Sequence, residues 1–415
     1  MIKNLINKYS IIKLLPVFFI YVIIIIIVSD NRLVLDEVRY KWYADNLTQG
    51  FYSPQDNITL WNGPGYPLFL VPFVLLKLPV FFLKFLNAIL TYCAVVVFFI
   101  TLKSLFPERK ILIPVYLLAL NPVMLFDMPF LLTESLTILL ICSITYFVVK
   151  IFYEKNYSKL NIIVLGFIIS YLAMTKIVFG YVILICLVLN LLLFLIRRKE
   201  NLKHTFIIFL LGFIFTLPYL IYTYSLTGKI YYWGSSGGSA MYWMSSPFKE
   251  EYGDWFSISN LSQNESLIKN HGEFWNKIKN MNELEMDEAL KSKALENAFA
   301  HPLKYSFNIL CNFGRMFFSY PYSYTFQKPT TYFYLIPNSV FFIFLVLSFI
   351  LLIKKIKKLD YYIYFILVFM IIYICGVSLG SAAPRYLTIM YPEFILIICY
   401  SYFKLFPGKL IIAKD

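Results

Sequence analysis

The sequence predicts an all-α, polytopic integral membrane protein. Of its 415 residues, 60% are hydrophobic and only 14% are charged, and the mean hydropathy is +0.70. Soluble domains are about 45–50% apolar and about 25% charged, so one water-soluble core could not bury this excess. Many of the apolar residues lie in runs close to the ~20 residues that a helix needs to cross a bilayer. A soluble protein, a disordered chain and a small disulfide scaffold are therefore excluded.

The apolar runs predict about ten transmembrane helices and two extracytoplasmic loop regions. We expect the helices near residues 14–29, 80–102, 111–126, 130–149, 160–175, 177–196, 205–225, 333–353, 361–379 and 386–403. The chain then divides into an N-terminal transmembrane module (1–225) with a first outer loop (30–79), a large outer loop (226–332) and C-terminal transmembrane helices (333–415). A cleaved signal peptide is the alternative for the first run. A retained helix is favoured because no small-residue cleavage site follows that run.

Basic residues predict the orientation of these helices. The net charge is +14, from 37 Lys and Arg against 23 Asp and Glu. In a soluble protein this excess would suggest a nucleic-acid partner. Here the basic residues cluster in short loops between apolar runs, where membrane topology alone places them. We therefore expect no nucleic-acid partner, both termini in the cytoplasm, and the loops at 30–79 and 226–332 on the extracytoplasmic side.

An acidic pair, Asp36 and Glu37, follows the first apolar run. A carboxylate pair at a helix exit is usually only solvated interface. This pair is followed by Tyr40, by a stretch with small residues that ends at Gly50, and by the turn Gly63-Pro64-Gly65-Tyr66-Pro67. The arrangement resembles the first outer loop of the GT-C superfamily of membrane glycosyltransferases, in the group that contains protein O-mannosyltransferases and the aminoarabinose transferases of lipid A.

Three later segments also resemble that family, and they follow in the family's order. They are Asn121-Pro122 with Leu131-Leu132-Thr133-Glu134-Ser135-Leu136, Ala298 with His301-Pro302-Leu303-Lys304-Tyr305, and Ala383-Pro384-Arg385-Tyr386-Leu387 with Tyr391-Pro392. No single segment is specific. Each falls on the expected outer side, however, and with the first loop they span most of the chain.

The resemblance implies a GT-C bundle and a transferase that moves a sugar from a polyprenyl phosphate donor to a lipid, glycan or protein acceptor. The reaction would invert the anomeric carbon on the extracytoplasmic face of a bacterial plasma membrane and serve the cell envelope. The family pattern makes Asp36 the catalytic base and Arg385 a ligand of the donor phosphate, and gives Glu37 a secondary role in orienting the acceptor or a neighbouring cation.

These residue types suit that chemistry. A carboxylate such as Asp36 can take the proton of an acceptor hydroxyl. The planar guanidinium of Arg385 can hold two phosphate oxygens as the lipid phosphate leaves. The alternative for Arg385 is a cation that extends from a helix end into the membrane interface.

The sequence departs from the family at one position. Relatives that act on lipid A often carry a Lys directly before the loop proline, where this chain has Gly63. Lys176, at the junction of two apolar runs, could supply the missing cation. Glu134 and Lys84 are further candidates because charges at membrane depth are costly and are usually paired or functional. Simple interfacial exposure is the alternative for each.

No cofactor is predicted from the sequence. No DxD-type pair argues for a required metal, although Asp36 and Glu37 could hold a divalent ion. We expect His271 to be a surface or interfacial residue rather than a ligand. A solvated helix face is expected for the acidic run Glu283, Glu285, Asp287 and Glu288.

Two rival functions stay open. A transporter or flippase of lipid-linked glycans would also be basic and polytopic, although transporters tend to show repeated halves and charges at the midplane, and neither is evident here. A glycan polymerase is the rival among enzymes, because such proteins also use large outer loops and Arg residues.

Overall fold

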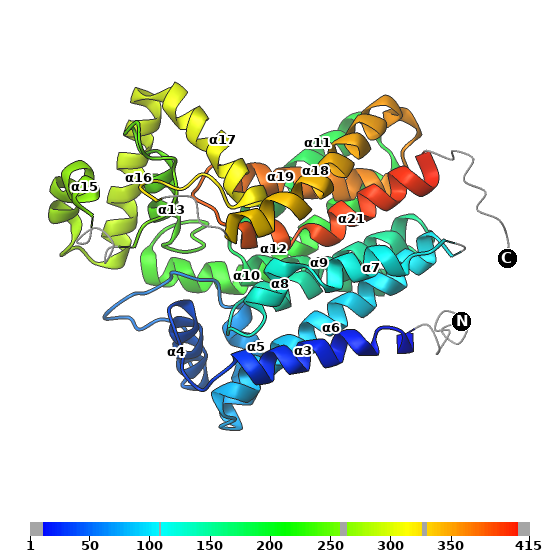
Figure 1. Ribbon diagram of the computed structural model, residues 1–415, viewed down its shortest axis with the longest axis horizontal. Helices are drawn as coiled ribbons and strands as arrows, with labels where there is room; N and C mark the ends of the chain where they lie inside the picture. The colour runs from blue at the N-terminus through cyan, green and yellow to red at the C-terminus, as the bar shows by residue number, and fades with distance from the viewer. Residues whose placement is uncertain (1–10, 108, 258–263, 326–329, 406–415) are drawn as a thin grey trace.

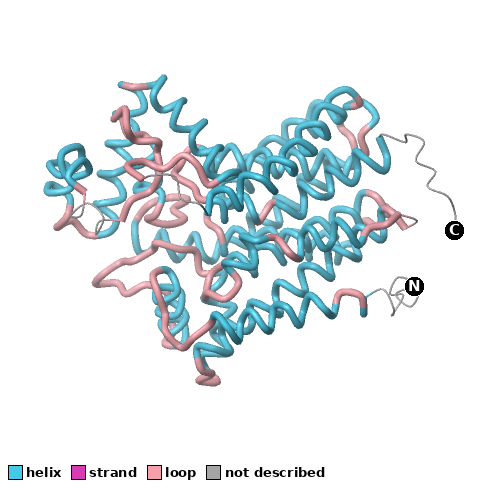
Figure 2. The backbone as a smooth tube through the Cα atoms, viewed as in Figure 1, coloured by secondary structure: helices cyan, strands magenta, loops and turns pink. Residues whose placement is uncertain are grey.

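The structure, a computed structural model, describes residues 11–107, 109–257, 264–325 and 330–405. Helices make up 75% of it, and no strand occurs within these ranges (Figure 2). The all-α prediction is therefore confirmed. The α-helices are α3 (Leu15–Val28), α4 (Asp36–Thr48), α5 (Gly65–Leu75), α6 (Val80–Leu105), α7 (Leu112–Ala119), α8 (Pro122–Asp127), α9 (Glu134–Phe152), α10 (Lys159–Thr175), α11 (Val178–Arg197), α12 (Glu200–Thr227), α13 (Gly237–Met244), α15 (Glu265–Ile278), α16 (Glu283–Ala300), α17 (Pro302–Phe318), α18 (Thr330–Lys354), α19 (Tyr361–Ser378), α20 (Pro384–Thr388) and α21 (Tyr391–Tyr400). A 3₁₀ turn, η1 (Ile356–Lys358), and a π-helical turn, η2 (Ser401–Leu405), complete the described elements.

Six helices in the described ranges are long and apolar enough to cross a membrane. They are α6, α9, α11, α12, the Tyr334–Lys354 part of α18, and α19. The helices α3, α5 and α10 are apolar but shorter. The structure therefore supports a helical membrane protein, whereas the predicted count of ten spans is not confirmed.

Two of the expected spans are interrupted, and proline explains both breaks. The run at 111–126 divides into α7 and α8, because Asn121 caps a new helix by accepting the Met124 N–H at 3.1 Å and Pro122 has no N–H to continue the preceding one. The run at 386–403 divides into α20, α21 and η2, with Pro392 in the first turn of α21.

The longer helices pack into one bundle. Helix α6 lies between α3 and α9, α9 also packs on α10, and α12 contacts both α10 and α11 (Figure 1). Helix α19 covers α11. In Figure 1, α3 begins and α21 ends on the right-hand side of this bundle, while α4, α13, α15 and α16 lie at its left end. We call the described part of segment 226–325 the outer region, after the side of the membrane that the sequence predicts for it.

The acidic run on α16 is not the wholly solvated face that we expected. Asp287 is 1% exposed and accepts hydrogen bonds from the Gly238 amide (2.7 Å) and the Tyr232 hydroxyl (3.1 Å). Glu283 accepts the Leu60 N–H at 2.9 Å. The expectation was wrong for these two residues because they are the polar contacts through which α16 holds α13 and the first outer loop.

Candidate functional site

Helix α4 places Asp36 and Glu37 in its first turn, where carboxylates also suit the positive end of the helix dipole. The Asp36 Oδ2 lies 3.2 Å from Arg385 Nη2, although the two residues are 349 positions apart. Arg39, one turn along α4, forms an ion pair with the other oxygen of Asp36. The structure thus brings together two residues that only the family resemblance had linked.

A second ion pair lies next to the first. Glu134, the first residue of α9, holds Lys176 through Oε1 and Nζ at 2.7 Å, and the same oxygen lies 3.9 Å from Arg385 Nε. Asp36, Arg385, Glu134 and Lys176 therefore form a continuous chain of alternating charges. We call these four residues, together with Arg39, the charged site.

The charged site is exposed at one side and buried at the other. The side chains of Asp36 and Arg385 are 27% and 32% exposed, whereas those of Glu134 and Lys176 are 5% and 12% exposed. Partial burial would by itself lower the pKa of Arg385, but the negative charges of Glu134 and Asp36 outweigh burial and raise it. Arg385 is thus a permanent cation with one face available to a ligand.

Tyr40 forms a wall of the charged site. Its hydroxyl accepts a hydrogen bond from Asn62 Nδ2 at 3.1 Å, and its ring packs edge-on against Tyr66 at 5.4 Å between centroids. Burial, followed by the charges of Glu134 and Asp36, raises the pKa of this phenol well above its usual value. Tyr40 is therefore a neutral group that shapes the site and whose hydroxyl proton is free to be donated to a hydrogen-bond acceptor.

Glu37 and Lys84 form a separate, buried pair. Glu37 Oε1 lies 3.1 Å from Lys84 Nζ and accepts the Leu131 N–H at 2.6 Å, and Oε2 accepts the Val34 N–H at 2.9 Å. Both side chains are at most 3% exposed. Glu37 is consequently committed to holding the start of α4 against α6 and the segment before α9, and Lys84 is the cation that it orients.

The position of Gly63 is filled from another part of the chain. A Cβ atom on Gly63 would lie 2.1 Å from the Met174 carbonyl oxygen, so no side chain fits there. The same close contact brings the end of α10, and with it Lys176, to the turn that carries Gly63. A lysine is therefore present beside this turn, although it comes from residue 176.

Sequence reasoning missed two residues at this site. Arg39 lies between Glu37 and Tyr40 in the sequence and was given no role. Asp127, at the end of α8, is 9% exposed, has one oxygen without a hydrogen-bond partner, and interacts electrostatically with Glu134, Arg385 and Lys176. Asp127 could have been found from the sequence, because a single carboxylate in an apolar run is often functional.

The carboxylates do not converge as metal ligands would. The oxygens of Asp36 face Arg39 and Arg385, whereas those of Glu37 face Lys84 and backbone amides. Within the described ranges, no group of three or more His, Cys, Asp or Glu side chains could hold a metal ion. The donor set around Asp36 and Glu37 thus does not fit the divalent ion that the sequence left open.

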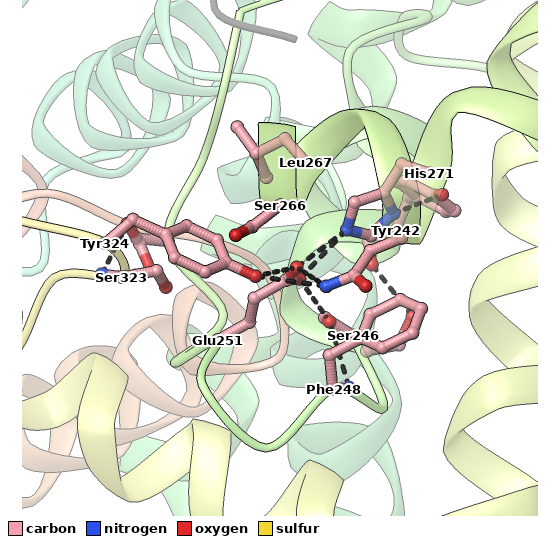
Figure 3. A network of polar contacts seen from close by, with 12 residues as sticks. Tyr242, Ser246, Phe248, Glu251, Ser266, Leu267, His271, Ser323 and Tyr324 are labelled. Carbon is pink, nitrogen blue, oxygen red and sulfur yellow. Dashed lines mark hydrogen bonds and ion pairs between the residues drawn. The ribbon is translucent and has the colours of Figure 1, made fainter. Parts of the chain in front are cut away.

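A second carboxylate cluster lies in the outer region (Figure 3). Glu251 accepts hydrogen bonds from Tyr324 (2.7 Å), Asn270 (2.9 Å) and Ser246, and both of its oxygens lie within 3.0 Å of His271 Nε2. The other ring nitrogen, Nδ1, lies 2.7 Å from the Tyr242 hydroxyl. His271 is 3% exposed, so placing it at the surface was wrong.

The pKa of Glu251 reflects this environment. Burial alone would raise the pKa of the carboxyl, but the hydrogen bond and charge of His271 and the hydrogen bonds of Ser246 and Asn270 lower it overall. Glu251 is therefore an anion whose hydrogen-bonding capacity is filled by protein groups.

Comparison of the chain with protein-family models, with curated proteins and with solved structures found no match. The resemblance to the GT-C superfamily is therefore still a prediction, and the geometry of the charged site carries the functional argument below.

Proposed function

We propose that the chain is a membrane glycosyltransferase of the GT-C kind, which transfers a sugar from a polyprenyl phosphate donor to a lipid, glycan or protein acceptor on the extracytoplasmic face. The observation that carries the proposal is the contact between Asp36 and Arg385, with Glu134 and Lys176 beside them. A partly exposed carboxylate next to partly exposed cations offers a base and an anion-binding group within one site.

The proposed reaction is a direct displacement. The acceptor oxygen bonds to the anomeric carbon while Asp36 takes its proton, and the bond between that carbon and the phosphate oxygen breaks. The electron pair leaves with the polyprenyl phosphate, whose growing negative charge is stabilised by Arg385 and Lys176. Such preorganised charges are most effective where water is partly excluded, as it is around Lys176 and Glu134.

The ion pairs also give the donor a role in preparing the base. In this structure Asp36 is held by two guanidinium groups, Arg39 and Arg385. A donor phosphate at Arg385 competes with Asp36 for that cation. Donor binding therefore weakens the ion pair and leaves the Asp36 carboxylate freer to accept a proton from the acceptor.

The first experiment needs neither the sugar nor the acceptor to be known. Polyprenyl phosphate, the common product, is titrated onto the purified protein in nanodiscs. We expect saturable binding that Arg385→Ala weakens by about 10-fold to 100-fold, the value of a hydrogen bond to a charged group. Exposed Arg197, which lies at the end of α11, supplies a matched control, Arg197→Ala. Equal binding by wild type and Arg385→Ala would remove Arg385 from the phosphate site.

The second experiment separates the enzyme from its rivals. Polyprenyl phosphate donors labelled in the sugar are incubated with the protein and a crude lipid, glycan or protein acceptor fraction. A transferase of this kind moves one label to the acceptor and releases polyprenyl phosphate. Movement of intact donor across a liposome without release would indicate a flippase, and a ladder of lengthening glycan would indicate a polymerase.

A further inference from the structure

A cavity of about 320 Å³ lies at the end of α6 that is remote from the charged site. Four basic side chains line one part of it, and apolar side chains line the rest. The basic residues are Lys13, Lys103, Arg109 and Lys110, and the apolar ones are Phe99, Ile111, Leu112 and Ile113. No acidic residue belongs to this lining in the part of the chain that the structure describes.

The distance along α6 between the Glu37–Lys84 pair, which lies next to Asp36 in the chain, and the cavity matches a bilayer. Lys84, which binds Glu37, and Lys103, which lines the cavity, are 19 positions apart on α6 (103 minus 84). At about 1.5 Å per residue, this separation is roughly 28 Å, close to the ~30 Å thickness of a hydrocarbon core. If the charged site lies at one membrane interface, the cavity lies at the other.

Topology accounts for the presence of basic residues at this end of the bundle, but not for their gathering with apolar side chains in one cavity. The positive-inside rule asks only for basic residues in cytoplasmic loops, and Lys354, Lys357 and Lys358 at the same end of the bundle satisfy it while lying outside this lining. At 103–113, by contrast, the cations share a concave site with hydrocarbon side chains. Ile113 is 66% exposed, so apolar surface continues from the cavity onto the flank of α7.

A smaller neighbouring cavity has fewer cations that could bind an anion. It measures about 220 Å³, shares Arg109 with the first, and is otherwise lined by Lys404 and mainly apolar or aromatic residues. Lys404 is already paired with Asp360 at 2.7 Å. The larger cavity is the one in which several cations gather.

We propose that the larger cavity binds the phosphodiester of an anionic glycerophospholipid from the leaflet opposite the charged site. The phosphate faces Lys103, Arg109 and Lys110, and the first part of an acyl chain lies along Leu112 and Ile113. Basic pockets between transmembrane helices at the cytoplasmic side commonly bind anionic headgroups. A zwitterionic lipid binds more weakly, because its choline or ethanolamine cation would meet these four positive side chains.

The test uses the full-length protein in mild detergent with two lipids, dioleoyl phosphatidylglycerol and dioleoyl phosphatidylcholine. Bound lipid is counted by native mass spectrometry. We expect saturable binding of phosphatidylglycerol and at least tenfold weaker binding of phosphatidylcholine. About fivefold in affinity should be lost for each cation removed, so Lys103→Gln/Arg109→Gln/Lys110→Gln should lose on the order of 100-fold.

The control carries the same change in charge at the same end of the bundle. Lys354→Gln/Lys357→Gln/Lys358→Gln should bind phosphatidylglycerol as the wild type does. An equal loss in this control would show general attraction to a basic surface and overturn the proposal. Unchanged binding by the cavity variant would overturn it as well. If the triple variant does not fold, the single variant Arg109→Gln replaces it. Its affinity for phosphatidylglycerol is expected to fall about fivefold, and an unchanged affinity would overturn the proposal.

Glycerol 3-phosphate distinguishes the lipid from a free phosphate compound. Because it carries the headgroup phosphate without acyl chains, we expect it to compete only at concentrations far above those of phosphatidylglycerol. Competition at equal concentration would mean that the cavity binds a soluble phosphate compound, and the lipid assignment would be wrong.

Discussion

The charged site and the Glu251 cluster both contain a carboxylate surrounded by charged or polar groups, but they are built in opposite ways. Asp36 is partly exposed and is held by two cations, of which Arg385 is also partly exposed. Glu251 is 1% exposed, and its oxygens accept hydrogen bonds from Ser246, Asn270 and Tyr324. The first cluster can exchange a protein partner for a ligand, whereas the second has no group left to offer.

From this difference we expect the charged site to be functional and the Glu251 cluster to stabilise the fold. A Glu–His pair with a hydroxyl beside it has the residue types of a catalytic centre, and a pattern of residue types would not distinguish it from one. Burial and complete hydrogen bonding argue for a structural role for Glu251, because a buried anion without partners would be costly. The predictions below test whether the two clusters separate in this way.

The largest effect is expected for Asp36→Asn. If Asp36 is the base, turnover should fall by about 10²-fold to 10⁴-fold, while folding is retained because the side chain keeps its shape. Affinity for the donor should stay the same or increase, since the variant no longer competes for Arg385. Turnover and donor binding are measured in parallel in nanodiscs.

Helix α4 supplies the control for that experiment. Asp45 pairs with Lys41 on the same helix and is 42% exposed, so Asp45→Asn removes an equivalent charge away from the site and should leave turnover unchanged. Glu37→Gln should cost less turnover than Asp36→Asn. Near-normal turnover in Asp36→Asn, or a loss due wholly to weaker donor binding, would contradict the assignment of Asp36 as base.

The second effect is expected for Arg385→Lys. Lysine keeps the positive charge but loses the planar fork that can hold two phosphate oxygens. Polyprenyl phosphate should bind about tenfold more weakly, and turnover should fall by at least as much. If the lysine variant binds as tightly as wild type, charge alone is sufficient, and the two-pronged contact is not used.

The sequence selected four residues of the charged site, but it did not predict how they contact one another. Asp36 and Arg385 were linked by resemblance, and Lys176 and Glu134 were selected because charges in apolar runs are costly. Two features of the site depend on how α9, α10 and the segment 30–79 pack together. One is the ion pair between Glu134 and Lys176, and the other is the close approach of the end of α10 to Gly63. Contacts between segments so far apart leave no periodic pattern in a single sequence.

The fold shows the same limit. Helices occur in all the predicted runs, because apolar length determines them, but Asn121 and Pro122 break one run and Pro392 shortens another. Those prolines were visible in the sequence and predict breaks at these positions. The burial of Asp287 and His271 was not visible, since both lie in polar stretches whose partners, such as Gly238 and Glu251, come from other parts of the outer region.

The third prediction concerns the Glu251 cluster. Glu251→Gln removes the charge and leaves at least one donor without its acceptor, which costs about 1–3 kcal/mol of stability in a buried site. Backbone amides of 242–257 and 264–275 should exchange hydrogen for deuterium faster in the variant, because the outer region opens more often. Turnover by the folded protein should stay within about twofold of wild type. A selective loss of turnover without faster exchange would give Glu251 a catalytic role, and the two clusters would then not differ in function.

The smallest effect is expected from acid pH on the outer region. Because the folded protein lowers the pKa of Glu251 below its ordinary value of 4.5, its ionised form stabilises the fold above that value. This contribution is lost as the pH falls through the lower pKa of the folded state.

The charged and titratable groups around Glu251 are His271, Tyr242, Tyr324 and Lys304. The effect of Glu251 is therefore obtained as the difference between wild type and Glu251→Gln. Deuterium exchange of 242–257 and 264–275 should differ between the two proteins at pH 7 and converge as the pH is lowered below 4.5. A difference that persists unchanged in acid would mean that the charge of Glu251 does not stabilise the outer region.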